Sequence, residues 1–479
     1  MTITVSTDLA RHIQEEFGEN VYLCYQCKKC TAGCPVAEHF DLTPNQVMRA
    51  LQFGQKDLVL NSKAIWLCAS CETCSTRCPQ GIDIARLMDA LRVMARREGV
   101  KPKVPEVPMF YNSALRGIKL FGRMHELSLM AELYMREFFA RRLDFKQFFS
   151  SDIPLAIKML RTGKLKIPPS VARARRDTAQ KLQAAREEAI AYYPGCSLHA
   201  TAVEYDISTK AVAKVLGLEL VEPEGWKCCG TSPAHATDPV LAAKLPMENL
   251  ALFEKEGFSY VTMPCAGCFT RFRHALHDMR ENPKLREEVA RALGYLPSKE
   301  IQVDNLLATI TDRVGYEKVA SKVKRPLRGL KVVCYYGCVL TRPPEITGVK
   351  DYEYPMNMDR LMEALGAESL DWSYKTDCCG GSLSLSQLPV ALEMCEKILR
   401  NAKEVGAEMI VVACPLCQAN LDMRQGQINE KFGTDYHMPI IYFTQVMGLA
   451  FGLSGRELAL EKLFTSPMDF LKSKGFLAS

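Results

Sequence analysis

The hydrophobic pattern divides the chain into two kinds of region. Up to residue 190, apolar residues recur mostly at helical spacing, as in DLTPNQVMRALQFG (41–54) and GIDIARLMDALRVMARREG (81–99). Thr43 is the expected N-cap of the first helix, with Pro44 at its first position, and Asp83 is the expected cap of the second, which should end near Gly99. From residue 191 onward, short apolar runs alternate with helical patterns, which is typical of α/β units with parallel strands.

The α/β region repeats itself. AYYPGCSL (191–198) matches CYYGCVLT (334–341), KCCGT (227–231) matches DCCGG (377–381), and EKEGFSYVTMPCAGC (254–268) matches KEVGAEMIVVACPLC (403–417). In each half a helix ends at a glycine, an apolar strand follows, and a Cys-x-x-Cys pair lies just past the strand's carboxyl end, where ligands bind in open α/β sheets. We therefore predict two tandem, pseudo-symmetric α/β domains.

The fold class expected is a multidomain α+β protein. Its predicted parts are an all-α domain over 1–100, a helical extension and linker over 101–190, and α/β domains over 191–325 and 326–479. ARARRDTAQKLQAAREEA (172–189) is the predicted linking helix. The sequence has no run of about 18 apolar residues and no signal-peptide layout at its start, so we expect a cytoplasmic protein that meets a membrane only through a partner.

Charge is concentrated in one region. The formal net charge is +6, and residues 101–190 hold 18 Lys and Arg against 9 Asp and Glu. These basic residues are interleaved with apolar ones, as in LRGIKLFGRMHELSLM (115–130), which indicates solvated or partner-facing helix surfaces rather than a nucleic-acid site.

The chain has 20 cysteines, which in a reducing compartment indicate metal ligation or redox chemistry rather than disulfides. Two runs near the N-terminus have the spacing C-x2-C-x2-C-x3-C-P, in which three thiolates hold one cubane and the fourth holds the other. Zinc would have no need of this crossed ligand. The predicted [4Fe-4S] ligand sets are Cys24, Cys27, Cys30 and Cys78 for cluster 1, and Cys68, Cys71, Cys74 and Cys34 for cluster 2.

The α/β halves each contain five further cysteines. The sets are Cys196, Cys228, Cys229, Cys265 and Cys268 in the first half, and Cys338, Cys378, Cys379, Cys414 and Cys417 in the second. Five is one more than a cubane needs, so either one cysteine of each set is idle or one thiolate bridges two irons. Adjacent cysteines reach one site only from a tight turn, which Gly230 and Gly380 would permit. If that turn opens a helix, its free N–H groups would stabilise an anionic cluster.

The remaining cysteines and the nearby bases have simpler expected roles. Cys334 lies in an apolar strand and Cys395 inside a helix, where each is expected to be a buried free thiol. His199, His235 and Lys375 lie near the cysteine motifs and are expected to be structural or surface residues.

The two CCG sets resemble the B subunits of heterodisulfide reductases, and the ferredoxin-like runs with IDIARLMDALRVMARREG resemble the C subunits. Their fusion resembles the catalytic subunit of membrane-linked heterodisulfide reductases. The resemblance implies four [4Fe-4S] clusters, two cubane and two noncubane, with the ten CCG cysteines holding the noncubane pair. It also implies reductive cleavage of a mixed disulfide between them.

The same resemblance implies partners in a hetero-oligomer. Because GxGxxG is absent, no flavin or nucleotide is expected in this chain, and the donor would be a cytochrome or a flavin-containing protein similar to the A subunits of these enzymes. No nucleic acid and no direct membrane insertion are expected. The CCG sets also resemble those of iron-sulfur subunits in complexes that oxidise glycolate, lactate or glycerol-3-phosphate, and in certain succinate dehydrogenases that feed a quinone. The alternative is therefore an electron relay without a disulfide substrate.

Overall fold

The N-terminal region is helical, as the apolar spacing predicts. The computed structural model describes residues 8–172, 189–298 and 301–477. Thr43 and Gln46 form a capping box at the start of one helix, and Asp83 accepts a hydrogen bond from the Arg86 N–H at the start of another, so both predicted caps are confirmed. The elements of this region are α1 (Asp8–Phe17), η1 (Val21–Leu23), α2 (Lys29–Ala32), η2 (Ala37–His39), α3 (Pro44–Gln52), α4 (Lys56–Leu60), α5 (Ala64–Leu67), α6 (Thr73–Thr76) and α7 (Ile84–Arg97).

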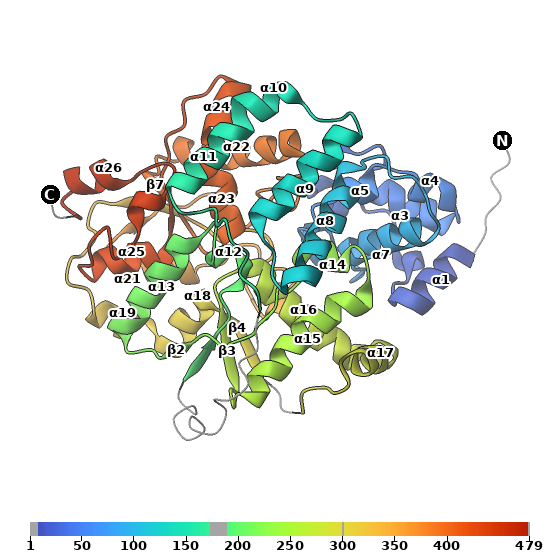
Figure 1. Ribbon diagram of the computed structural model, residues 1–479, viewed down its shortest axis with the longest axis horizontal. Coiled ribbons are helices and arrows are strands. Elements are labelled where there is room, and N and C mark those ends of the chain that lie inside the picture. Colours follow the sequence, from blue (N-terminus) through green and yellow to red (C-terminus); the bar gives the residue numbers. More distant parts are fainter. Residues whose placement is uncertain (1–7, 173–188, 299–300, 478–479) are drawn as a thin grey trace.

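A helical extension follows. Figure 1 shows α8 and α9 beside the N-terminal helices and α10 and α11 crossing to the opposite part of the molecule, close to α22, α23 and α24. Its elements are α8 (Glu106–Phe121), α9 (Glu126–Phe139), α10 (Phe145–Gln147), η3 (Phe148–Asp152) and α11 (Ile153–Arg161). The predicted linking helix over 172–189 falls almost entirely outside the described residues.

The first α/β domain is built on a parallel sheet of strand order β2-β1-β3-β4. The predicted strand FSYVTM is β3, all four of whose residues are buried because helices cover the sheet. The elements are β1 (Ile190–Tyr192), α12 (Gly195–Leu198), α13 (Val203–Leu216), β2 (Leu220–Val221), α14 (Thr231–His235), α15 (Pro239–Lys255), β3 (Tyr260–Met263), α16 (Ala266–Glu281), α17 (Pro283–Leu293), β4 (Gln302–Asn305), α18 (Leu306–Ala308), η5 (Thr309–Val314) and α19 (Tyr316–Ser321).

The second α/β domain repeats this arrangement with the order β6-β5-β7-β8, again all parallel. The identical strand order confirms the pseudo-symmetry predicted from the repeated motifs. The elements are β5 (Lys331–Tyr335), α20 (Pro344–Thr347), α21 (Asn357–Ala364), β6 (Glu368–Ser369), α22 (Leu388–Glu404), β7 (Met409–Val412), α23 (Pro415–Met423), α24 (Gln425–Phe432), β8 (Ile440–Tyr442), α25 (Phe443–Ala450), η6 (Leu460–Lys462) and α26 (Met468–Ser473).

The two sheet domains share one continuous buried core, whereas the N-terminal helices have a core of their own. At the junction of the sheet domains, Tyr205 of α13 stacks on Tyr442 with ring centroids 4.0 Å apart. Ser208 and Thr444 share a hydrogen bond of 2.7 Å beside this stack. The junction is therefore packed like a protein interior, which fixes the two carboxyl strand edges relative to each other.

Candidate iron-sulfur sites

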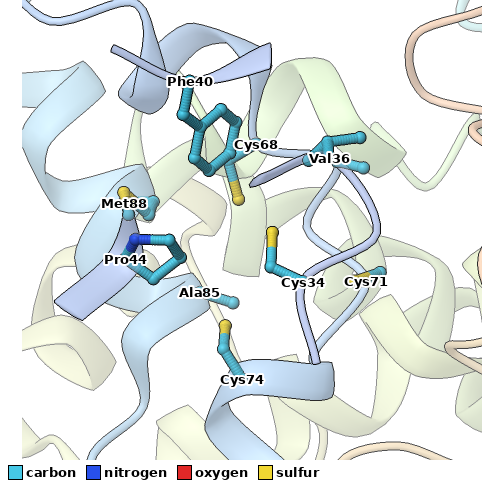
Figure 2. Close-up of a pocket in the computed structure, with 10 residues that line it drawn as sticks. Cys34, Val36, Phe40, Pro44, Cys68, Cys71, Cys74, Ala85 and Met88 are labelled. Carbon is cyan, nitrogen blue, oxygen red and sulfur yellow. The ribbon is translucent and has the colours of Figure 1, made fainter. Parts of the chain in front are cut away.

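The second ferredoxin-like run surrounds a cavity with a cysteine of the first run. Cys34 joins Cys68, Cys71 and Cys74 in lining one cavity, together with apolar side chains that include Phe40. Figure 2 shows the sulfur atoms of Cys34, Cys68 and Cys74 pointing into this common space. The structure thus brings together the four residues of the crossed set predicted for cluster 2.

The first run lies closer to the surface than the second, although its third cysteine, Cys30, is buried. Burial raises the pKa of the Cys30 thiol, and nearby Cys24 and Cys27 add to the rise. Tyr25 lies close to both Cys27 and Cys78, so the fourth cysteine of the second run reaches this site. Cys27 is exposed, in contrast to the buried Cys71 at the matching position of the second run. The cluster 1 set is therefore the one that faces solvent.

The backbone of the two runs turns in the same unusual way. In both runs the residues on either side of the second cysteine have positive φ. They are Gln26 (63°) and Lys28 (65°) around Cys27, and Ser70 (49°) and Glu72 (61°) around Cys71. Left-handed residues of this kind occur in the backbone nests with which proteins bind anions. These four residues are non-glycine, so nothing in their side chains marked them in the sequence.

The first CCG set assembles at the carboxyl ends of β1 and β3. The Sγ atoms of Cys229 and Cys268 are 3.4 Å apart. Thiol hydrogen bonds from Cys196 and Cys229 hold the pKa of Cys228 well below its usual value. Cys265 is the N-cap residue of α16 and interacts with Cys268 one turn later, so all five predicted cysteines lie within one connected group.

The second CCG set has the same construction. The Sγ atoms of Cys379 and Cys417 are 3.7 Å apart. Cys338 interacts with Cys378, whose pKa is raised well above its usual value by this contact and by burial. Cys414 is the N-cap residue of α23. The structure therefore brings together all ten cysteines predicted for the two CCG sites, five in each.

The separate sites touch one another in a fixed order. A hydrogen bond from Cys378 lowers the pKa of Cys71 to about 6, so the cluster 2 set adjoins the second CCG set. Hydrogen bonds from Cys265 and Cys417 hold the pKa of Cys414 well below its usual value, so the two CCG sets also adjoin. Cys30 of the cluster 1 set lies close to Cys34 of the cluster 2 set, so the predicted sets follow one another as the cluster 1 set, the cluster 2 set, the second CCG set and the first CCG set.

A buried arginine fixes the junction between cluster 2 and the second CCG set. Arg342 is 1% exposed and donates to the Thr73 hydroxyl at 3.0 Å and to the Thr376 carbonyl at 2.9 Å. Its other nitrogen pairs with Glu353, which also binds Arg77. Thr73 directly precedes Cys74 of the cluster 2 set, and Thr376 lies two positions before Cys378 of the second CCG set. The Arg342 guanidinium therefore holds the two sets together and places a positive charge beside their anionic ligands.

Two glycines that sequence analysis overlooked lie closest to the cysteine sulfurs. A Cβ at Gly195 (φ 72°) would lie 2.9 Å from Cys268 Sγ, and one at Gly337 (φ 74°) would lie 2.9 Å from Cys417 Sγ. The signal that could have found them is their shared place in the matching stretches YPGC and YYGC. Both positions need glycine for conformation and for close approach.

The predicted turn glycines serve the turn itself. Gly230 (φ 80°) and Gly380 (φ 73°) both have left-handed backbone after the paired cysteines. A Cβ at Gly230 would meet Leu245 at 2.6 Å, and one at Gly380 would meet Met394 at 2.9 Å, so the crowding is with neighbouring helices rather than with cysteine sulfur. Gly230 is the N-cap residue of α14, whereas turns follow Gly380. The turn after Cys229 therefore leads into a helix N-terminus, and the turn after Cys379 does not.

A matching tyrosine braces each pair of adjacent cysteines. The Tyr193 hydroxyl donates to the Lys227 carbonyl at 2.7 Å, and the Tyr335 hydroxyl donates to the Asp377 carbonyl at 2.6 Å. In each half the accepting carbonyl belongs to the residue immediately before the pair. The sequence repeat contained these tyrosines, but only the fold shows what they hold.

The helical extension covers the first CCG set. The Met124 N–H donates to Cys196 Sγ at 3.4 Å, and the Cys228 N–H donates to the Gly122 carbonyl at 2.8 Å. Burial raises the pKa of the Glu126 carboxyl to about 7, and nearby Cys228 adds to the rise. The extension thus places an acid that is partly protonated at neutral pH beside this set, which sequence reasoning missed.

The two leftover cysteines are buried, as expected. Cys334 is 0% and Cys395 is 1% exposed. Cys395 donates to the Cys379 carbonyl at 3.3 Å, so it supports the second CCG turn from outside the set.

The three bases near the motifs are all engaged elsewhere. His199 pairs with Glu222 at 2.9 Å, His235 with Asp89 at 2.6 Å, and Lys375 with the buried Asp359 at 2.6 Å. These pairings agree with the structural roles expected from the sequence.

Comparison with known families and proteins decides the relationship. A model described as "4Fe-4S dicluster domain" matches residues 23–83, and one described as "Cysteine-rich domain" (CCG) matches residues 190–273 and 332–422. The B subunit of the ferredoxin/F(420)H(2)-dependent CoB-CoM heterodisulfide reductase of Methanosarcina acetivorans is 30% identical over 288 residues, 59% of this chain and 95% of that protein. The chain belongs to the family of heterodisulfide reductase B subunits.

Other relatives are similar over a comparable share of the chain. The 8-methylmenaquinol:fumarate reductase membrane anchor subunit of Wolinella succinogenes is 32% identical over 275 residues, 57% of this chain and 96% of that protein. The D subunit of the dihydromethanophenazine:CoB–CoM heterodisulfide reductase of Methanosarcina barkeri is 28% identical over 247 residues, 48% of this chain and 53% of that protein. In this chain the part that resembles the B subunits is fused to a ferredoxin-like N-terminal domain.

The residues of this family member fit iron-sulfur clusters. The four cysteines of the cluster 2 set line one cavity, and thiolates of this kind are the ligands of iron-sulfur clusters. The chain is thus an iron-sulfur protein of the heterodisulfide reductase type.

Substitution of Cys34 tests the crossed arrangement. Because Cys34 lies with Cys68, Cys71 and Cys74, the Cys34→Ser protein is expected to lose the same EPR signal as Cys68→Ser, with the other ferredoxin-type signal retained. Cys24→Ser and Cys78→Ser form the matched pair for the other site. If Cys34→Ser instead altered the signal that Cys24→Ser alters, each run would hold its own cluster.

Proposed function

We propose that this chain passes electrons through two cubane [4Fe-4S] clusters to two noncubane [4Fe-4S] clusters and cleaves a disulfide between the two CCG sets. The observation that supports this proposal is the meeting of Cys265 and Cys414, which joins two complete five-cysteine sets. A complete second set adds nothing that a simple relay needs, but it supplies a second site for the second sulfur of a substrate.

The proposed path follows the contacts between the sets. It begins at exposed Cys27, continues to the cluster 2 cavity, crosses from Cys71 to Cys378, and ends between Cys414 and Cys265. The second CCG set would therefore receive electrons before the first. The two halves are alike in fold but different in position along the path.

The reaction balances as R–S–S–R′ + 2 e⁻ + 2 H⁺ → RSH + R′SH. When bound, the clusters supply the electrons one at a time. The chain's own groups exclude water, since nine of the ten CCG cysteines are buried. The Glu126 carboxyl can hold one of the protons near the first set, and Arg342 keeps the second set against its source of electrons.

The electron donor is proposed to dock on the exposed face around cluster 1. Tyr22, Leu23 and Tyr25 are 50%, 48% and 60% exposed, and exposed Lys28 and Lys29 lie beside Cys27. Residues 20–36 contain no acidic residue. This face suits an acidic redox partner in a hetero-oligomer assembled in the cytoplasm, either a cytochrome or a flavin-containing protein similar to the A subunits of heterodisulfide reductases.

Reversal of the two lysine charges tests the docking face. The Lys28→Glu/Lys29→Glu protein is expected to accept electrons from an acidic donor about tenfold more slowly at low salt, with a smaller difference at high salt. Reduction by dithionite should be unchanged, because it needs no docking. Lys101→Glu/Arg286→Glu, which reverses two exposed charges outside residues 20–36, is the matched control. Equal rates for all three proteins with the donor would contradict this face.

The second candidate function is an electron relay without a disulfide substrate. The similarity to a membrane anchor subunit of a menaquinol:fumarate reductase favours it, since that relative is named for a quinol-linked complex. In that case the same path of cysteine sets carries electrons between a quinone-linked partner and a separate catalytic subunit. Reduction of disulfides by the isolated, pre-reduced chain separates the two functions.

A further inference from the structure

The helical extension has an apolar face that the rest of the described chain leaves uncovered. Of the eighteen large hydrophobic residues that are exposed in the described residues, ten lie between residues 120 and 171. Seven of these occupy α9, α10, η3 and α11, and we call them the α9–α11 surface: Met135, Phe138, Phe139, Phe145, Phe149, Ile157 and Leu160. Phe139 is 80% exposed and Phe149 is 64% exposed. So dense a group of exposed hydrophobic side chains marks an interaction surface.

The α9–α11 surface is ordered by its own contacts. The Phe138 ring packs edge-on against Phe139 and Phe145, with centroids 5.7 and 6.3 Å apart. The opposite side of the same helices is attached to the second CCG domain, where Gln427 donates to Ser151 and Lys158 donates to the Phe464 carbonyl at 3.2 Å. Figure 1 shows α10 at the outer edge of the molecule, with α24 and α22 behind it.

The exposed charged side chains around this surface are almost all basic. Between residues 131 and 172, six exposed residues are basic and one, Asp144, is acidic. Asp144 is the N-cap of α10 and accepts a hydrogen bond from the Gln147 N–H. The described residues offer no hydrogen bond or ion pair to the side chains of four of the basic residues: Arg141, Lys146, Arg161 and Lys166.

We propose that the α9–α11 surface lies on an anionic lipid bilayer. Phenylalanine, leucine and isoleucine side chains would enter the boundary between headgroups and acyl chains, while the four basic side chains bind lipid phosphates. A protein interface with an aromatic core is usually depleted in lysine, whereas here Lys146 lies between Phe145 and Phe149 in the sequence. The pattern is that of helices that lie in the plane of a membrane surface.

This attachment differs from a membrane span and from the proposed redox function. In the described part of the chain, no helix is long and apolar enough to cross a bilayer. The sequence led us to expect contact with a membrane only through a partner, and the surface adds a direct contact that needs no cluster and no electron transfer. The side of the molecule that faces the lipid would be the second CCG domain with its attached helices.

Vesicle sedimentation of the full-length, anaerobically purified protein tests the proposal. The protein should sediment with vesicles of mixed phosphatidylcholine and phosphatidylglycerol, and at least about tenfold less with vesicles of phosphatidylcholine alone. Phe139→Ser/Phe149→Ser and Arg141→Glu/Lys146→Glu should each reduce binding to the mixed vesicles by about tenfold or more. The iron content of these variants shows that they fold.

Matched controls use exposed positions elsewhere. Tyr295 is 53% exposed and Arg286 is exposed, and Tyr295→Ser/Arg286→Glu should bind vesicles as the wild type does. The proposal is overturned if the wild type binds neither kind of vesicle, or if the α9–α11 variants bind as the wild type does. It is equally overturned if the variants lose a protein partner but keep their affinity for lipid.

Discussion

Replacement of Cys379 by serine is expected to abolish disulfide reduction while the ferredoxin-type clusters remain intact. Cys379 is 4% exposed, and its Sγ lies 3.7 Å from Cys417 Sγ within the second CCG set. Its carbonyl accepts hydrogen bonds from Asn420 and Cys395, so the surrounding structure holds this residue in place and offers no substitute sulfur. Activity should fall by at least about 100-fold, more than the loss of a group that only supports a ligand causes.

Spectra and iron content separate this effect from misfolding. The Cys379→Ser protein should lose the noncubane signal of the second half and keep both ferredoxin-type EPR signals. Cys395→Ser is the matched control, because a serine hydroxyl can still donate to the Cys379 carbonyl from the same helix. An unchanged spectrum in Cys379→Ser, or equal loss in both proteins, would contradict the assignment of Cys379 as a ligand.

Gly337→Ala is expected to disrupt the same site without removing any thiol. Its φ of 74° is costly for alanine, and the new Cβ would lie 2.9 Å from Cys417 Sγ. We expect a destabilisation of about 2–5 kcal/mol from backbone strain and overpacking together, with loss of iron from the second CCG set. Urea unfolding and iron analysis of the purified protein measure the two effects.

Gly406→Ala separates the steric effect from backbone strain. Gly406 has a φ of 79° in the same domain, but a Cβ there would meet no atom within 4 Å. This substitution should cost only about 1–2 kcal/mol and leave the iron content unchanged. If Gly337→Ala kept its iron and matched Gly406→Ala in stability, the close approach to Cys417 would have no consequence.

Much of the fold and of the candidate sites could be predicted because cysteine spacing is local and repeated. Each Cys-x-x-Cys pair follows an apolar strand pattern, so the sequence alone placed Cys265 and Cys414 at carboxyl strand edges, where both lie. The proline after each ferredoxin-like run indicated the crossed ligand, and Cys34 does lie with the second run.

The remaining features depend on contacts between residues far apart in the sequence. Neither the approach of Cys71 to Cys378 nor the anchoring of Thr73 by Arg342 leaves a periodic signal, because only packing of the N-terminal domain on the second sheet domain creates them. The covering of Cys196 by Met124 has the same origin. The basic, apolar extension was correctly predicted as helical, but the sequence could not show which of its faces stays exposed.

The central claim is that the two CCG sets act together on a disulfide. Its most direct test is an anaerobic titration of the partly reduced protein with disulfides, including the CoB-CoM heterodisulfide, monitored by EPR. We expect a paramagnetic state that appears with the disulfide, accompanies release of two thiols, and is absent from Cys229→Ser and Cys379→Ser. If no disulfide changed the spectrum while a quinone accepted electrons rapidly from the reduced chain, the relay function would hold and disulfide cleavage would be contradicted.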